Sequence, residues 1–202
     1  MPTLERVCKR LFSNQSAVLK CLIGGLLMMV PVAHFLAFGV LYALIEQAGR
    51  GQKPELPSWR GWRRLFAGGV VAFVIFVVLG LAPICAGWIL SWPLRSLVIG
   101  PLRYLPLIPG LLLAAPLTAA GIYQYQRGQS FRAAFRLAEL AGMLESCRGG
   151  FFVPTLALLG FVAVGYPLMP ITLFVGLAAA FTFYATSFRM LEESRKGGPR
   201  SP

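Results

Sequence analysis

The sequence predicts an all-α fold: a polytopic integral membrane helical bundle with four to five transmembrane helices plus amphipathic interfacial helices. Three observations predict it. Of the 202 residues, 57% are hydrophobic and only 13% are charged, whereas a typical soluble domain has about 25% charged residues. The mean hydropathy is +0.70. The hydrophobic residues are concentrated in long runs, which is typical of membrane spans. These features exclude a soluble globular enzyme, a disordered tail and a disulfide-stapled secreted domain.

Residues 1–19 are predicted to form an amphipathic segment on the membrane surface, because apolar residues recur at helical spacing among basic ones. The first apolar run, 21–45, is 25 residues long, longer than the apolar region of a signal peptide, so we expect it to be retained. Pro31 and His34 lie near its middle. Proline removes a backbone donor and clashes with the preceding turn. The run is therefore either one kinked span or a re-entrant hairpin, and its length slightly favours the span.

Four further apolar segments are predicted to span the membrane and belong, with the first run, to a single domain of residues 20–193. As a helix, residues 65–90 would cover about 39 Å, enough for a hydrocarbon core of about 30 Å. Trp59 and Trp62 precede this segment, where indole rings anchor spans at the interface. The predicted spans are 65–90, 105–125, 151–166 and 170–191, and 194–202 is predicted to be a flexible tail.

Two segments are not expected to be straight transmembrane helices. The segment 105–125 contains Pro106, Pro109 and Pro116, and we expect it to be bent. Residues 130–147 are predicted to form an amphipathic interfacial helix capped by Ser130. Its polar face carries Arg132, Arg136, Glu139 and Glu145, and Arg136 and Glu139 are at helical contact spacing.

The charge distribution predicts the orientation. The chain has 19 Lys and Arg against 7 Asp and Glu, for a net charge of +12. With four spans, the segments 46–64 and 126–149 and the C-terminal tail share one side and carry 13 cations, against two on the other side. The positive-inside rule makes the richer side, with the C-terminus, cytoplasmic. Four N-terminal cations join that side only if 21–45 is a hairpin, so charge favours the hairpin.

Few residues suit catalysis or metal binding. The chain has one histidine and no aspartate, so paired carboxylates and Ser-His-Asp sets are missing, and we expect no enzyme activity. The four cysteines form no CxxC pair, so we expect no metal and no cofactor. Glu46, Glu139 and Glu145 are expected to pair with neighbouring arginines. Nothing in the sequence resembles a nucleic-acid-binding motif.

Several motifs resemble the bacterial and archaeal membrane-protein family called domain of unknown function 4013. They include KCLIGGLLMMVPVAHFLAFG, ELPSWRGWRRLFAGG, RGQSFRAAFRLAEL, FFVPTLALLGF and FTFYATSF, and they extend from about Lys20 to Glu193. The resemblance implies a compact α-helical domain in the cytoplasmic (inner) membrane of a prokaryote. It brings no reaction, substrate or catalytic residue. Family members tend to be acidic after the Leu-Pro-x-Trp element, whereas this chain is basic there.

Our leading hypothesis is a non-enzymatic membrane protein with a basic cytoplasmic face formed by 46–64 and 126–149. This face would bind anionic membrane lipid, a membrane-protein partner or a second copy of the chain. A small transporter or permease component is the alternative, with a site at the helices expected to be broken at Pro31, Pro109 and Pro116. Pro31 and His34 are its candidate intramembrane residues. The residues expected on the basic face are Trp59, Arg60, Trp62, Arg63, Arg64, Arg132 and Arg136.

Overall fold

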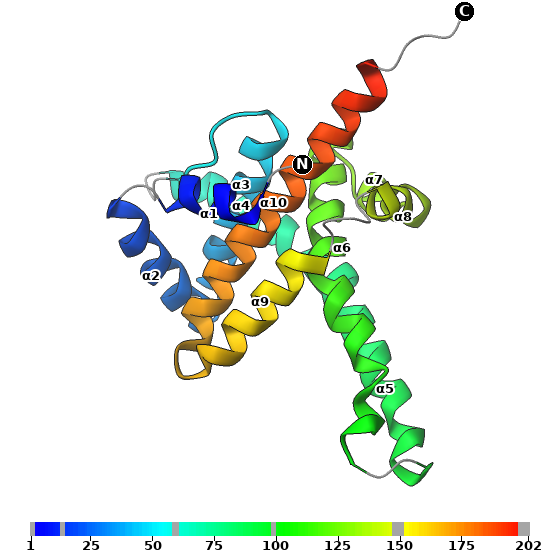
Figure 1. The fold of residues 1–202 in the computed structure, drawn as a ribbon. Helices are drawn as coiled ribbons and strands as arrows, with labels where there is room; N and C mark the ends of the chain where they lie inside the picture. The colour runs from blue at the N-terminus through cyan, green and yellow to red at the C-terminus, as the bar shows by residue number, and fades with distance from the viewer. Residues whose placement is uncertain (1–2, 13–14, 58–60, 98–99, 147–151, 198–202) are drawn as a thin grey trace, which may run out of the picture.

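The computed structural model describes residues 3–12, 15–57, 61–97, 100–146 and 152–197, which form helices and no β-strand, as the predicted all-α class requires (Figure 1). In chain order the elements are α1 (Leu4–Leu11), α2 (Gln15–Met29), α3 (His34–Gly49), α4 (Trp62–Ile75), the π-helix η2 (Phe76–Leu81), α5 (Ala82–Leu97), the 3-10 turn η3 (Pro101–Tyr104), α6 (Leu107–Gly128), α7 (Phe131–Ala134), α8 (Leu137–Ser146), α9 (Phe152–Val164), the 3-10 turn η4 (Tyr166–Leu168) and α10 (Met169–Gly197).

Three helices of the described chain are long and apolar enough to cross a membrane. They cover Trp62–Leu94, Leu102–Gly128 and Tyr166–Ser194 and contain the predicted spans 65–90, 105–125 and 170–191. The predicted span 151–166 is α9, a 13-residue helix of about 20 Å. It is shorter than a hydrocarbon core of about 30 Å. By length and composition the count is therefore three, and the predicted four to five is not confirmed.

The run 21–45 is divided into two helices that pack against each other. α2 ends at Met29, residues 30–33 form a turn around Pro31, and α3 begins at His34. Val32 in this turn has a φ of 74°, a left-handed conformation that a helix cannot contain. Lys20 Nζ, at the start of α2, donates a 2.7 Å hydrogen bond to the carbonyl of Leu56, beyond the end of α3. The two helices fold back on each other, and the structure therefore has the hairpin, not the slightly favoured kinked span.

α4, η2 and α5 are consecutive segments of one long helix, which packs against α6. In Figure 1 the α5–α6 hairpin (green) projects beyond the remaining helices. The prolines expected to bend 105–125 do not break α6. Pro106 is the N-cap residue and Pro109 lies in the first turn, where backbone N–H groups have no helical partner to lose. Pro116 lies inside the helix, which continues to Gly128.

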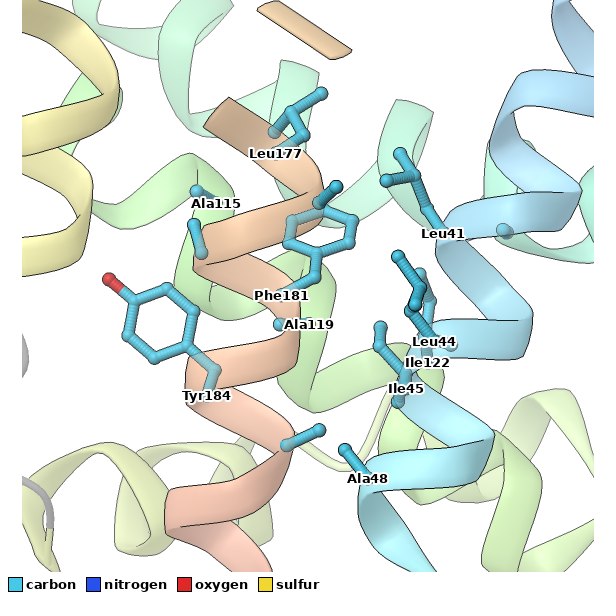
Figure 2. Packing of buried hydrophobic residues seen from close by; sticks show 14 of the residues in the cluster. Leu41, Leu44, Ile45, Ala48, Ala115, Ala119, Ile122, Leu177, Phe181 and Tyr184 are labelled. Atoms are coloured by element: carbon cyan, nitrogen blue, oxygen red, sulfur yellow. The ribbon is translucent and has the colours of Figure 1, made fainter. Parts of the chain in front are cut away.

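The buried core lies where α3, α6 and α10 meet. α10 packs against α2, α3, α6 and α9, and Phe174, Phe181 and Tyr184 are among its largest buried side chains. Figure 2 shows Phe181 directed from α10 toward α3, where Leu41 and Leu44 are fully buried, and Tyr184 on another side of α10. The hydroxyl of Tyr184 shares a 2.7 Å hydrogen bond with Thr155 Oγ1 of α9. This buried bond fixes α9 against α10.

α3 and α4 are in backbone contact at two glycines. A Cβ on Gly39 would collide with the carbonyl oxygen of Leu65, and a Cβ on Gly69 would collide with that of Phe35. Small residues let membrane helices approach this closely, and van der Waals packing then drives their association. Gly39 meets Leu65 while Phe35 meets Gly69, so the two helices are antiparallel and the end of α3 lies beside the start of α4.

Three segments outside the predicted spans, residues 1–19, 130–147 and 194–202, differ from the prediction. Val7 and Leu11 of α1 are buried, and α1 packs against α10. The predicted helix 130–147 is two helices, α7 and α8, separated at 135–136. Ser130 caps α7 as predicted, since its Oγ accepts a 3.3 Å hydrogen bond from the Ala133 N–H. α10 continues to Gly197, into the predicted tail, and 198–202 lie outside the described residues.

Candidate functional site

Charged side chains from several helices gather at one end of the bundle, which we call the charged end. It consists of the last turns of α3 and α6, the first turn of α4, the short helix α7 that follows α6, and the turns of α10 from Arg189 onward. In α3 the fully buried Ile45 is followed by Glu46, and in α10 the buried Phe188 is followed by Arg189. The charged side chains therefore begin at the depth where the apolar core ends, which in a membrane is the level of the lipid head groups.

Glu46 links α3 to α4. Its side chain is 19% exposed and forms ion pairs with Arg50 at 2.7 Å and with Arg64 at 3.0 Å. Arg50 is the C-cap residue of α3, where a cation is stabilised by the negative end of the helix dipole. The prediction that Glu46 pairs with neighbouring arginines is confirmed, and so is that for Glu139, which pairs with Arg136 at 2.8 Å.

Glu192 links α6 to α10. Its carboxylate, 26% exposed on the side chain, forms an ion pair with Arg127 and accepts a 3.1 Å hydrogen bond from the hydroxyl of Tyr123. Tyr123 is almost fully buried, so its hydroxyl needs such a partner. One turn further along α6, Gln126 Nε2 donates a 2.8 Å hydrogen bond to the carbonyl of Tyr42 in α3. Polar contacts thus tie α6 to both neighbours.

A polar cavity of about 390 Å³ opens between these three helices, within the size range of small-ligand sites. Arg189 reaches it from α10 and pairs with Glu193 through a 2.7 Å contact between Nε and Oε1. Gly51, with a φ of 74°, leaves room for the Arg189 guanidinium, which a Cβ there would meet. The charged residues of the wall, three of each sign, are Glu46, Arg50, Arg127, Arg189, Glu192 and Glu193.

A second cavity of about 370 Å³ adjoins the first at Glu192. It lies between α6, α8 and α10 and is lined in part by Met143, Phe188 and Leu191. The polar cavity therefore has a neighbour with a partly apolar wall, and the two share a carboxylate.

The structure separates the residues predicted for the basic face. Figure 1 shows α7 and α8 on one side of α10 and the α3–α4 connection on the other. Trp62 begins α4, is 54% exposed, and lies with its ring centroid 5.5 Å from the guanidinium carbon of Arg63. Arg63 and Arg132 have no carboxylate partner in the described part of the chain, whereas Arg64 and Arg136 are both in ion pairs. Trp59 and Arg60 lie outside the described residues.

Pro31 and His34 lie at the far end of the α2–α3 hairpin from these charges. His34 packs among aromatic rings, with centroid distances of 4.2 Å to Phe35 and 4.9 Å to Phe73. Its Nε2 is buried and has no hydrogen-bond partner among the described residues. Among the described residues, no carboxylate forms a hydrogen bond or ion pair with His34, and no three metal-ligating side chains form a cluster.

Comparison with known proteins identifies the family. The family described as "Protein of unknown function (DUF4013)" matches residues 22–175, about three-quarters of the chain. This chain is a member of the DUF4013 family. The matched region extends from α2 into the first turns of α10, so it contains Glu46 and Arg127 but ends before Arg189. Neither the curated proteins nor the solved structures give a match.

Sequence reasoning missed most of the polar cavity in this DUF4013 protein. The charge count includes Arg127 and Arg189 only as flanking cations, and the sequence pattern assigns no role to Glu192 or Tyr42. A signal was available, because each wall helix changes from apolar to charged residues at its end. The missing information was that the three ends meet.

Proposed function

We propose that this protein is a non-enzymatic integral membrane protein of the prokaryotic inner membrane, with its charged end facing the cytoplasm and binding anionic lipid there. The proposal rests on two arginines that form no ion pair with any described carboxylate. Arg63 and Arg132 are exposed and have no carboxylate partner in the described chain. Their charge is therefore available to lipid phosphates, and each basic residue near an anionic surface contributes about 1 kcal/mol.

Trp62 supports the same placement. It begins a helix long enough to span the membrane, its indole is half-exposed, and the Arg63 guanidinium lies beside it. Indole rings favour the interface between head groups and acyl chains. An arginine held next to such a ring lies at the depth of the lipid phosphates, which is where an anionic head group would meet it.

The experiment compares two double variants that remove the same net charge. Arg63→Gln with Arg132→Gln removes the unpaired cations, and Arg64→Gln with Arg136→Gln removes cations that already have a carboxylate partner. The purified protein is analysed by native mass spectrometry from nanodiscs of phosphatidylglycerol and phosphatidylcholine. We expect the first double variant to retain fewer phosphatidylglycerol molecules than the wild type and the second to retain nearly as many. Equal retention by both variants would show that only net charge matters and would refute the proposal.

The transporter alternative is favoured by one observation, the unbonded Nε2 of His34 beside the helix break at Pro31. Broken helices build substrate sites in many transporters. Pro109 and Pro116 no longer support it, because α6 is continuous through both. Loss of proton-dependent uptake in His34→Ala would favour a transporter, and the absence of flux in reconstituted vesicles would count against one.

A further inference from the structure

The wall of the polar cavity carries balanced charges of both signs. A small anion in this cavity would face three carboxylates, and a small cation would face three guanidinium groups. Only a ligand with both charges meets a complementary group on every side. The C-terminal ends of α3 and α6 also lie here, and the negative end of each helix dipole favours a cation.

We propose that the polar cavity binds a phosphate ester that carries a primary ammonium group. The phosphate meets the arginines, which bind phosphate oxygens through several N–H donors. The ammonium meets Glu46 and Glu193, since it donates three hydrogen bonds that carboxylate and carbonyl oxygens accept. A quaternary ammonium group has no N–H and would lose these bonds.

The need to hold the helices together does not account for all of these charges. An ion pair that ties a bundle joins different helices, as Arg127 and Glu192 do. Glu46 also does so through Arg64, but the ion pairs of Arg50 with Glu46 and of Arg189 with Glu193 each join residues one turn apart on the same helix. Such pairs add only about 0.3–0.5 kcal/mol to a helix, yet both line the cavity. A ligand between them gives these charges a shared function.

The position of the cavity favours a lipid as the source of this ligand. The wall begins where the buried apolar segments end, at the head-group level. The adjoining cavity, lined in part by Met143, Phe188 and Leu191, offers an apolar surface for the first carbons of an acyl chain. Phosphatidylethanolamine has the required phosphate and primary ammonium, and soluble O-phosphoethanolamine has the same two groups without acyl chains.

The test measures the affinity of the full-length protein in a neutral detergent for short-chain lipids by microscale thermophoresis. The probes are dihexanoyl-phosphatidylethanolamine, the matching phosphatidylcholine and phosphatidylglycerol, and O-phosphoethanolamine. We expect phosphatidylethanolamine to bind about tenfold more tightly than phosphatidylcholine, since a hydrogen bond to a charged group is worth 1.4 kcal/mol or more. Weaker binding of O-phosphoethanolamine identifies a lipid ligand, and equal binding identifies a soluble one; either supports the proposed chemistry.

Glu193→Gln is the main variant, because its carboxylate is 59% exposed and its loss leaves the core intact. It should weaken phosphatidylethanolamine binding about fivefold and leave phosphatidylcholine binding unchanged. Glu5→Gln is the matched control, since Glu5 pairs with Lys9 over the same i,i+4 spacing at 2.7 Å, on α1. Arg50→Gln should weaken the binding of both lipids. Equal wild-type affinities for the two lipids, tighter binding of phosphatidylglycerol, or no effect of Glu193→Gln would overturn the proposal.

Discussion

Truncating Phe181 tests whether the junction of α3, α6 and α10 is the structural core beneath the charged end. Phe181 is fully buried. In a soluble protein, Phe→Ala at such a site costs about 3–5 kcal/mol, which includes the transfer of the ring out of water. In a membrane this transfer contribution is absent, because lipid tails are as apolar as a side chain.

The remaining cost is that of the cavity. The substitution removes roughly 100 Å³ of side chain, and at about 24 cal/mol per Å³ an uncollapsed cavity costs about 2.4 kcal/mol. The control is Phe161→Ala on α9. Phe161 is 47% exposed on an apolar helix, where lipid replaces the lost contacts. Its truncation should cost less than about 0.5 kcal/mol.

The assay is unfolding in mixed micelles with increasing dodecyl sulfate, followed by circular dichroism. Both variants remove the same atoms. The difference between their losses in free energy of unfolding therefore compares a ring buried in protein with a ring that faces lipid. Equal losses of stability for Phe181→Ala and Phe161→Ala would refute the reasoning, because they would place α9 and the α10 centre in equivalent surroundings.

The remaining predictions concern topology, helix packing and reactivity. Single cysteines are introduced at Lys9, Gln52, Gln129 or Leu102 in a cysteine-free background. In intact cells, those at Lys9, Gln52 and Gln129 should be protected from an external thiol reagent, while the one at Leu102 should be labelled. External labelling at Lys9 with Gln52 and Gln129 still protected would show that the first run crosses the membrane. Gly69→Val should lower the melting temperature by several degrees because its side chain collides with the α3 backbone, whereas Gly160→Val, where a Cβ meets nothing within 4 Å, should not. Burial raises the pKa of the Cys8 thiol above its ordinary value. In a protein with Cys8 as its single cysteine, alkylation should therefore require a higher pH than alkylation of a free thiol such as glutathione; half-maximal alkylation of both thiols at the same pH would contradict this.

The sequence predicted the helical segments better than their connections. The apolar runs 65–90 and 170–191 lie within candidate spans, because their length and composition determine a helix regardless of neighbours. The first run was ambiguous, since length favoured a span and charge favoured a hairpin. Pro31 did interrupt the helix while Pro116 did not. The same residue type breaks a helix in one place and not in another because packing against neighbouring helices decides whether the lost backbone bond can be tolerated.

The candidate site could be predicted only in part, for a reason that follows from helical geometry. Arg136 and Glu139 are one turn apart on the same helix, so their spacing predicted the ion pair that the structure contains. Arg127 and Glu192 are far apart in the chain, and no local pattern indicates that they meet. The packing of α6 against α10 brings them together, and the small and aromatic residues at this contact are part of the buried core. The apolar packing therefore determines which charges face one another. A substitution in the core, such as Phe181→Ala, should alter the polar cavity as well as stability, whereas Glu193→Gln should alter ligand binding alone.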